Sequence, residues 1–194
     1  MRSIWAVAAA LTLLLSFPLA VASSVLGEDV PEIVVHIVLG TGMLLFAKAI
    51  FDFGLPRWLS WVGALSASAL GAIFLLQAVS LLVPNNAALY DVAFAFLGQW
   101  PERLLPLGYL AWFVGLLLVR TEGRTRLVGW ALIPIVTLYQ LISVAGAILA
   151  IDVPNIRLIF FVPFVWLLIE GAKRAPGAVG PQTPDAEHAD VPAA

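Results

Sequence analysis

Long apolar segments separated by short polar stretches dominate the pattern along this chain. A transmembrane helix needs about 20 mostly apolar residues, and five segments satisfy this requirement clearly. They cover residues 33–54, 58–83, 104–120, 127–151 and 156–173, and a further apolar segment, residues 4–21, precedes them. The pattern predicts an all-α integral membrane bundle of six transmembrane helices within residues 1–174.

The first segment has two interpretations. Arg2, the apolar core that follows it and the small residues at 20–22 also fit a secretory signal with a cleavage site. Multi-pass proteins commonly keep their first span, so we expect a retained helix and leave cleavage as the alternative. Either outcome leaves the other five segments unchanged.

Basic residues in the loops predict the orientation, because cytoplasmic loops carry an excess of Lys and Arg. With an inside N-terminus, the cytoplasmic sides hold Arg2, Lys48, Arg57, Arg120, Arg124, Arg126, Lys173 and Arg174. The outer sides hold only Arg103 and Arg157. We therefore expect a multi-pass protein of a bacterial cell (inner) membrane, with the N- and C-termini in the cytoplasm.

One connection is longer than a tight turn. Residues 84–103 begin with Pro84 and two asparagines, and then carry apolar and aromatic residues with a single early charge at Asp91. This pattern favours a short interfacial helix in the third loop, capped by an asparagine and lying flat at the outer surface. A re-entrant segment is the alternative. Pro101 and Glu102 are then expected to open the fourth span.

Composition narrows the classes further. The 194 residues are 62% hydrophobic and 11% charged, whereas a soluble domain is about 45–50% apolar. The apolar runs lack the alternation of a transmembrane β-barrel, and a net charge of -2 argues against a nucleic-acid partner. There is no cysteine. Residues 175–194 form an acidic tail rich in Pro and Ala, which we expect to be disordered and cytoplasmic.

Six predicted spans of similar length and two short stretches resemble small six-helix bacterial integral membrane proteins of unknown function. The stretches are Gly54-Leu55-Pro56-Arg57-Trp58-Leu59-Ser60-Trp61 and Val162-Pro163-Phe164-Val165-Trp166. The resemblance implies the six-span topology and carries no functional residue to this chain.

Three polar residues in the predicted outer half are the candidate ligand-binding site: His36, Gln77 and Gln140. His36, Gly40 and Met43 share one helical stripe, and we expect space beside the imidazole because Gly40 lies one turn below it. The glutamines are commonly interhelical hydrogen-bonding groups, which is the interpretation that we favour over a ligand cavity. Haem or metal binding at His36 lacks a second ligand, so we expect no metal and no cofactor.

Other features indicate packing. Lys48 and Asp52 share a helix face at the inner end, and Gly63, Ala67 and Gly71 recur at four-residue spacing, which favours close helix approach. No catalytic motif is present in the sequence. We therefore expect a non-enzymatic accessory or scaffold subunit, with the lipid bilayer and another membrane protein as partners. The alternative is a binder or carrier of a small quinone-like or isoprenoid-like molecule in an outer-half cavity.

Overall fold

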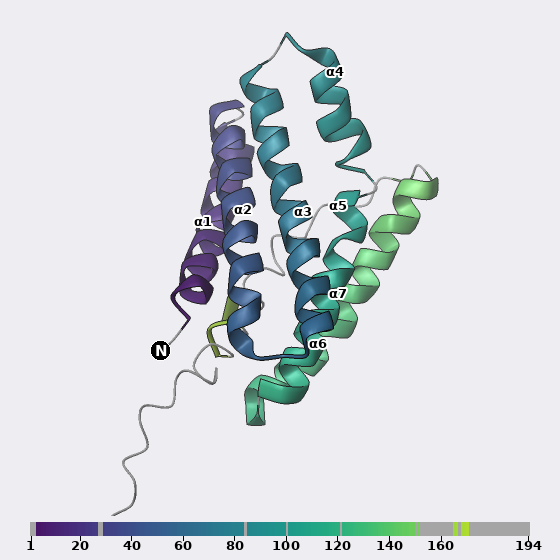
Figure 1. Ribbon diagram of the computed structural model, residues 1–194. Coiled ribbons are helices and arrows are strands. Elements are labelled where there is room, and N and C mark those ends of the chain that lie inside the picture. Colours follow the sequence, from purple (N-terminus) through teal and green to yellow (C-terminus); the bar gives the residue numbers. More distant parts are fainter. Residues whose placement is uncertain are drawn as a thin grey trace, which may run out of the picture.

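The computed structural model describes residues 3–26, 29–83, 85–99, 101–120, 122–149, 151, 165–166 and 168–170. Every regular element in these ranges is a helix, so the predicted all-α class is confirmed. Figure 1 shows the helices side by side along a common direction.

Helices α1 (Ile4–Leu26) and α2 (Asp29–Ala49) form an antiparallel pair. Leu13 packs against Gly42, where a β-carbon would lie 2.9 Å from the leucine Cδ2 atom. At the N-terminal end of α1, the Ser3 hydroxyl donates to Asp52 Oδ2, and Lys48 Nζ lies 4.9 Å from the centre of a ring of Trp5. Lys48 and Asp52 therefore both contact α1, and they form no ion pair with each other.

A glycine turn joins α2 to α3 (Arg57–Leu82). The 3-10 helix η1 (Ile50–Phe53) extends α2 and ends at Gly54, whose φ of 64° is left-handed. A side chain is strained in that conformation, so glycine suits the end of the helix. Pro56 then stands at the N-cap of α3.

Glycine contacts bring α3 close to its neighbours on both sides. The carbonyl oxygen of Gly40 on α2 lies 2.9 Å from where a β-carbon of Gly71 would be. A β-carbon at Gly63 would lie 2.8 Å from Cβ of Trp112. The predicted packing role of the small residues is confirmed at these two positions. Trp112 is buried where it meets the rings of Phe46 and Phe53 edge-on.

The chain then returns along α3 in several helical pieces. They are α4 (Ala87–Tyr90), the π-helix η2 (Asp91–Phe96), α5 (Pro101–Leu104) and α6 (Pro106–Arg120). Asn86 caps α4 by accepting a hydrogen bond from the backbone N–H of Leu89 at 3.1 Å. This short helix descends along the upper part of α3 toward α5 (Figure 1), so the structure does not confirm a helix lying flat in the third loop. Its place at a membrane surface remains a prediction.

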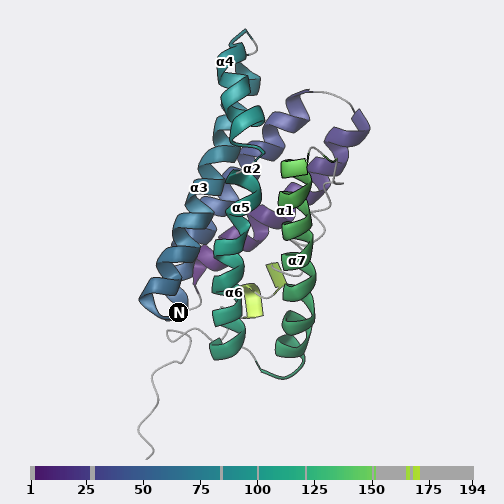
Figure 2. The same cartoon turned by 90° about the vertical axis from the view of Figure 1, so that its right-hand side faces the viewer.

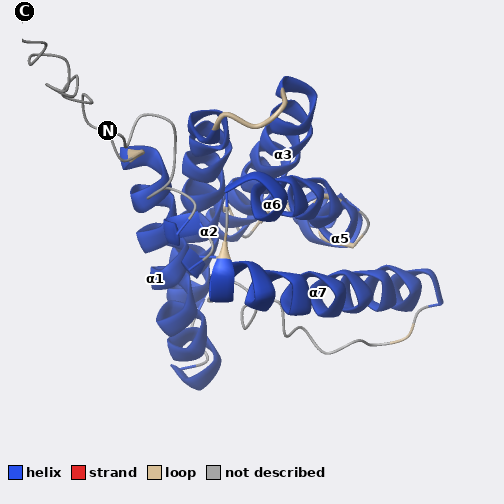
Figure 3. Cartoon of the chain, turned by 90° about the horizontal axis from the view of Figure 1, so that it is seen from below, coloured by secondary structure: helices blue, strands red, loops and turns tan. Residues whose placement is uncertain are grey.

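Helix α7 (Gly123–Leu149) lies at the edge of the bundle, where α6 and α5 are its main neighbours (Figures 2 and 3). One face of α7 is buried against them: Gly129, Ile133, Val136, Gln140, Ser143 and Gly146. The spacing of these residues, three or four apart, is that of one helix face.

Four helical stretches among the described residues are long and apolar enough to cross a membrane. They are Glu32–Phe53, Arg57–Leu82, Ala87–Val119 and Gly123–Leu149, and a shorter apolar helix covers Ile4–Leu19. The third of these begins well before the predicted fourth span at 104–120. Most of the predicted sixth span, 156–173, and all of the tail at 175–194 lie outside the described residues. Val165 and Leu168 of that span are buried in the apolar core.

Candidate functional site

Polar side chains from three helical segments meet at the short helix α5. We call this set the α5 polar cluster. It consists of Gln77 on α3, Glu102 and Arg103 on α5, and Gln140 and Ser143 on α7. Two of the three residues predicted as a ligand site, Gln77 and Gln140, belong to this cluster.

Gln77 joins α3 to the returning segment. Its side-chain amide is buried, with 2% exposure, and Nε2 donates to the carbonyl oxygen of Ala93 at 3.3 Å and to Glu102 Oε2 at 3.1 Å. Gly98 leaves room for this amide, because a β-carbon there would lie 3.2 Å from Gln77 Nε2 and 2.6 Å from the Phe94 carbonyl oxygen.

Arg103 and Gln140 join α5 to α7. Arg103 Nη1 donates to the backbone oxygen of Ser143 at 2.6 Å and to its hydroxyl oxygen at 3.1 Å. In the opposite direction, Gln140 Nε2 donates to the backbone carbonyl of Arg103. Gln140 and Ser143 are both 2% exposed, so these contacts lie inside the protein.

Two prolines flank the segment where the polar groups gather. Pro101 and Pro106 have no N–H, so helical hydrogen bonding is interrupted ahead of each. An interrupted helix in an apolar environment leaves carbonyl oxygens that need other donors. Beside this interruption the carbonyl of Arg103 accepts from Gln140 Nε2, and the carbonyl of Leu105 accepts both from the hydroxyl of Ser66 on α3 and from the backbone N–H of Gly108.

His36 lies beside the cluster without a hydrogen bond to either glutamine. Its Nδ1 atom is 2.9 Å from the carbonyl oxygen of Glu32, one turn back on the same helix. Its ring meets Phe74 and Phe94 edge-on, with centroids 6.2 Å and 5.7 Å away. The imidazole is therefore half-buried among aromatic rings, and one of them, Phe94, directly follows Ala93, whose carbonyl binds Gln77.

The space expected beside His36 is filled. Gly40 does lie on the interior stripe, and Met43 is buried. A β-carbon at Gly40, however, would lie 2.7 Å from Leu75 Cγ and 2.9 Å from the Gly71 carbonyl oxygen. The small residue serves the close approach of α2 and α3, which the helix pattern of α2 alone does not reveal.

Sequence reasoning missed Glu102, Arg103 and Ser143 as partners of the glutamines. Glu102 and Arg103 were assigned to the outer end of a span because a uniform apolar run starts after them. One sequence feature could have identified them. An acid and a base, Glu102 and Arg103, stand side by side between two prolines, with apolar sequence before and after. Ionisable residues in such a position are by default candidates for a functional site.

Two atoms of the cluster have no hydrogen-bond partner within the part of the chain that the structure describes. They are the buried acceptor Gln77 Oε1 and the buried donor Arg103 Nε, and Trp112 Nε1, in the aromatic core, is a third buried atom of this kind. An unpaired buried polar group costs about 1–3 kcal/mol and calls for an explanation. The cluster therefore offers one acceptor and one donor to a further group.

A small cavity lies elsewhere, among apolar side chains. Its lining consists of Leu13, Met43, Phe46, Tyr109, Phe113, Val165 and Leu168. Its volume of about 20 Å³ suffices for about one water molecule. None of His36, Gln77 and Gln140 lines it, so this cavity is not the one expected for a lipophile in the outer half.

In comparisons with known proteins, no family model, curated protein or solved structure matches this chain. The fold and the cluster thus define the class only as an all-helical protein whose long apolar helices fit a membrane.

Proposed function

We propose that this chain is a multi-pass protein of the bacterial inner membrane that acts as a non-enzymatic accessory or scaffold subunit. In this proposal it has six spans, and α7 is the helix that packs against a partner membrane protein. The length and apolar character of four described helices support the membrane location.

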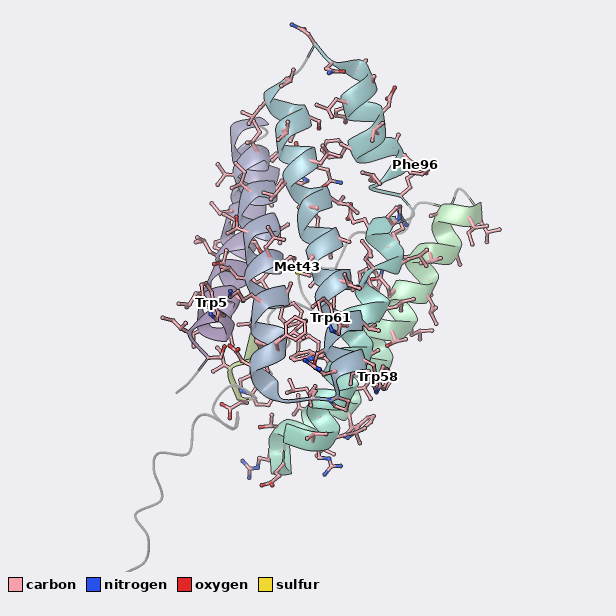
Figure 4. All side chains as sticks on the ribbon, in the orientation of Figure 1. Trp5, Met43, Trp58, Trp61 and Phe96 are labelled. Atoms are coloured by element: carbon pink, nitrogen blue, oxygen red, sulfur yellow. The ribbon has the colours of Figure 1, made fainter. Side chains whose placement is uncertain are left out.

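The arrangement of the connections supports cytoplasmic termini. The α2–α3 turn and the α6–α7 connection lie at the same end of the bundle as the first described residue (Figure 1). Lys48, Arg57, Arg124 and Arg126 belong to that end, which makes it the cytoplasmic side by the excess of basic residues. Trp58 and Trp61 lie near the same end (Figure 4), with 68% and 55% exposure, as interfacial aromatic residues should.

The observation that carries the accessory role is the exposure of α7. Of the most apolar 18-residue stretch of α7, only 28% is buried inside the protein. The corresponding stretches of α2–η1 and α3 are each 50% buried. The face opposite the buried stripe is a continuous apolar stripe of large side chains: Ile135, Leu138, Ile142 and Leu149, each at least half exposed. A helix held along one face only has a second face available to a helix of another protein.

The polar cluster supports a structural role for the interior. Gln77, Gln140 and Arg103 use their donors mainly on backbone carbonyls and on Glu102. Such contacts are worth about 0.6–2 kcal/mol each in membranes and hold helices together. They hold the interrupted segment between α3 and α7. The exposed apolar stripe of α7 therefore keeps a fixed position relative to α3.

Site-specific photo-crosslinking in the native host tests this proposal. A benzoyl-phenylalanine at Leu138 should give one adduct of defined mass, with the cross-link mapped by mass spectrometry to a transmembrane segment of another protein. The matched control is the same probe at Leu65 on α3, which is 64% exposed and outside the α7 stripe. No protein adduct at Leu138, or the same adducts at both positions, would show that α7 faces lipid only.

A further inference from the structure

From the α5 polar cluster we infer that the helix break at α5 binds the head group of a quinone-like membrane lipophile, through Gln77 Oε1 and Arg103 Nε. The basis is the pair of buried atoms without partners, one an acceptor and the other a donor. This inference does not depend on the accessory role of α7, which concerns another face of the molecule.

The hydrogen bonds already made by Gln77 and Arg103 determine which donors and acceptors a ligand must have. Both N–H bonds of Gln77 Nε2 are used, on Ala93 and Glu102, so its Oε1 atom needs a donor from elsewhere. Arg103 binds Ser143 through Nη1, so its Nε–H needs an acceptor. A head group with one hydroxyl that donates and a second oxygen that accepts satisfies both requirements, as the two hydroxyl groups of a reduced quinone do.

Charge favours a neutral head group. Glu102 and Arg103 carry opposite charges and are adjacent in the chain, so the break is locally balanced. An anion drawn to Arg103 would meet the carboxylate next to it, and carrying an extra charge into an apolar region is costly. A neutral carbonyl or hydroxyl group has neither cost.

Aromatic side chains beside the break favour a flat ring. Phe74 lies one turn before Gln77 on α3, and Phe94 follows the Ala93 carbonyl that Gln77 binds. Phe94 stacks on Tyr90 with ring centroids 4.7 Å apart, and both Phe74 and Phe94 meet the His36 ring. Rings of this kind offer faces and edges to a planar ligand.

The depth of the break suits a lipophile that enters from the membrane. Gln77 lies seven residues beyond Leu70, near the middle of α3, which is about 10 Å along the helix. With α3 centred in a bilayer, the cluster lies within the hydrocarbon region, whose half-thickness is about 15 Å. A quinone ring reaches this depth with its isoprenoid chain still in lipid.

The experiment measures binding of decylubiquinol, the reduced form that carries hydroxyl donors, to the full chain in phosphatidylcholine nanodiscs under anaerobic conditions, relative to empty nanodiscs. Gln77→Lys keeps N–H donors for Ala93 and Glu102 but removes the free acceptor. Arg103→Lys keeps the charge and a donor for Ser143 but removes Nε. We expect saturable binding to the wild type and an increase in Kd of about tenfold or more in each variant, the effect of losing one buried hydrogen bond.

The matched control is Thr12→Val on α1, whose hydroxyl bonds only within its own helix, to the Ala8 carbonyl. It should bind as the wild type does. Absence of saturable binding, or unchanged binding in both lysine variants, would overturn the inference and assign the two atoms to a buried water. If a lysine variant fails to fold, photolabelling of the wild type with an azido-quinol decides the question. Labelling confined to peptides outside residues 74–105 overturns the site. None of these outcomes bears on the α7 cross-link.

Discussion

Gly40 on α2 and Gly71 on α3 meet backbone to backbone. Each carbonyl oxygen lies 2.9 Å from the position that a β-carbon would take on the other residue. Because real β-carbons essentially never come so close to another atom, the two helices keep this separation only while both residues are glycine. The contact fixes how α2, with His36 one turn above, sits against α3.

Replacing Gly71 with valine should therefore destabilise the protein. The added atoms would meet Gly40 and also Leu44, whose Cγ atom lies 3.1 Å from the β-carbon position. Overpacking of this kind costs about 1–3 kcal/mol. The measurement is the free energy of unfolding in mixed detergent micelles. Ala72→Val, an exposed position next in the chain, is the control and should change it by less than about 0.5 kcal/mol. Equal effects at 71 and 72 would contradict the close contact.

Gln140→Leu should lower the free energy of unfolding by about 1–2 kcal/mol, because it leaves the Arg103 carbonyl without its donor. His36→Phe should change it little, since the imidazole bonds only to its own helix and its ring contacts suit a phenylalanine equally well. Unfolding of both variants in the same detergent mixture measures the difference. A larger loss for His36→Phe than for Gln140→Leu would mean that the imidazole, rather than the amide, holds the cluster.

Cysteine labelling tests the orientation, and the absence of native cysteine gives a clean background. Asn85→Cys lies in the exposed α3–α4 turn, and Thr125→Cys lies in the first turn of α7. An impermeant maleimide on intact cells should label the first variant alone, whereas permeabilised cells should show label on both. Labelling of Thr125→Cys in intact cells would reverse the predicted orientation.

The inward direction of the two glutamines was predictable from periodicity. Leu70, Ile73 and Gln77 are buried together on α3, and so are Val136, Gln140 and Ser143 on α7. A polar residue that shares a stripe with residues facing a neighbouring helix turns inward with them. This reasoning works within one helix and needs no knowledge of the partner.

The partners of those glutamines were not predictable in the same way. Pro101 and Glu102 were interpreted as the start of a span, which suits a helix N-terminus in isolation. The structure instead has helix on both sides of α5, where Gln140 and Ser66 donate to the carbonyls of Arg103 and Leu105. Such contacts depend on how the helices are packed, which the pattern of one helix does not reveal. Periodicity likewise placed Gly40 in the interior correctly, but whether a glycine leaves a space or admits a backbone depends on the facing helix.

The accessory role depends on the exposed apolar stripe of α7, and the size of the native complex tests it most directly. The measurement is native gel electrophoresis of host membranes in mild detergent, comparing wild type with Leu138→Trp/Ile142→Trp. Both side chains are at least half exposed, so the double variant should keep the melting temperature of the purified protein. Leu65→Trp is the control. The proposal predicts a complex larger than the isolated chain for the wild type and the control, and its loss in the double variant. A wild type that migrates as the isolated chain, or a complex unchanged in the double variant, would contradict it.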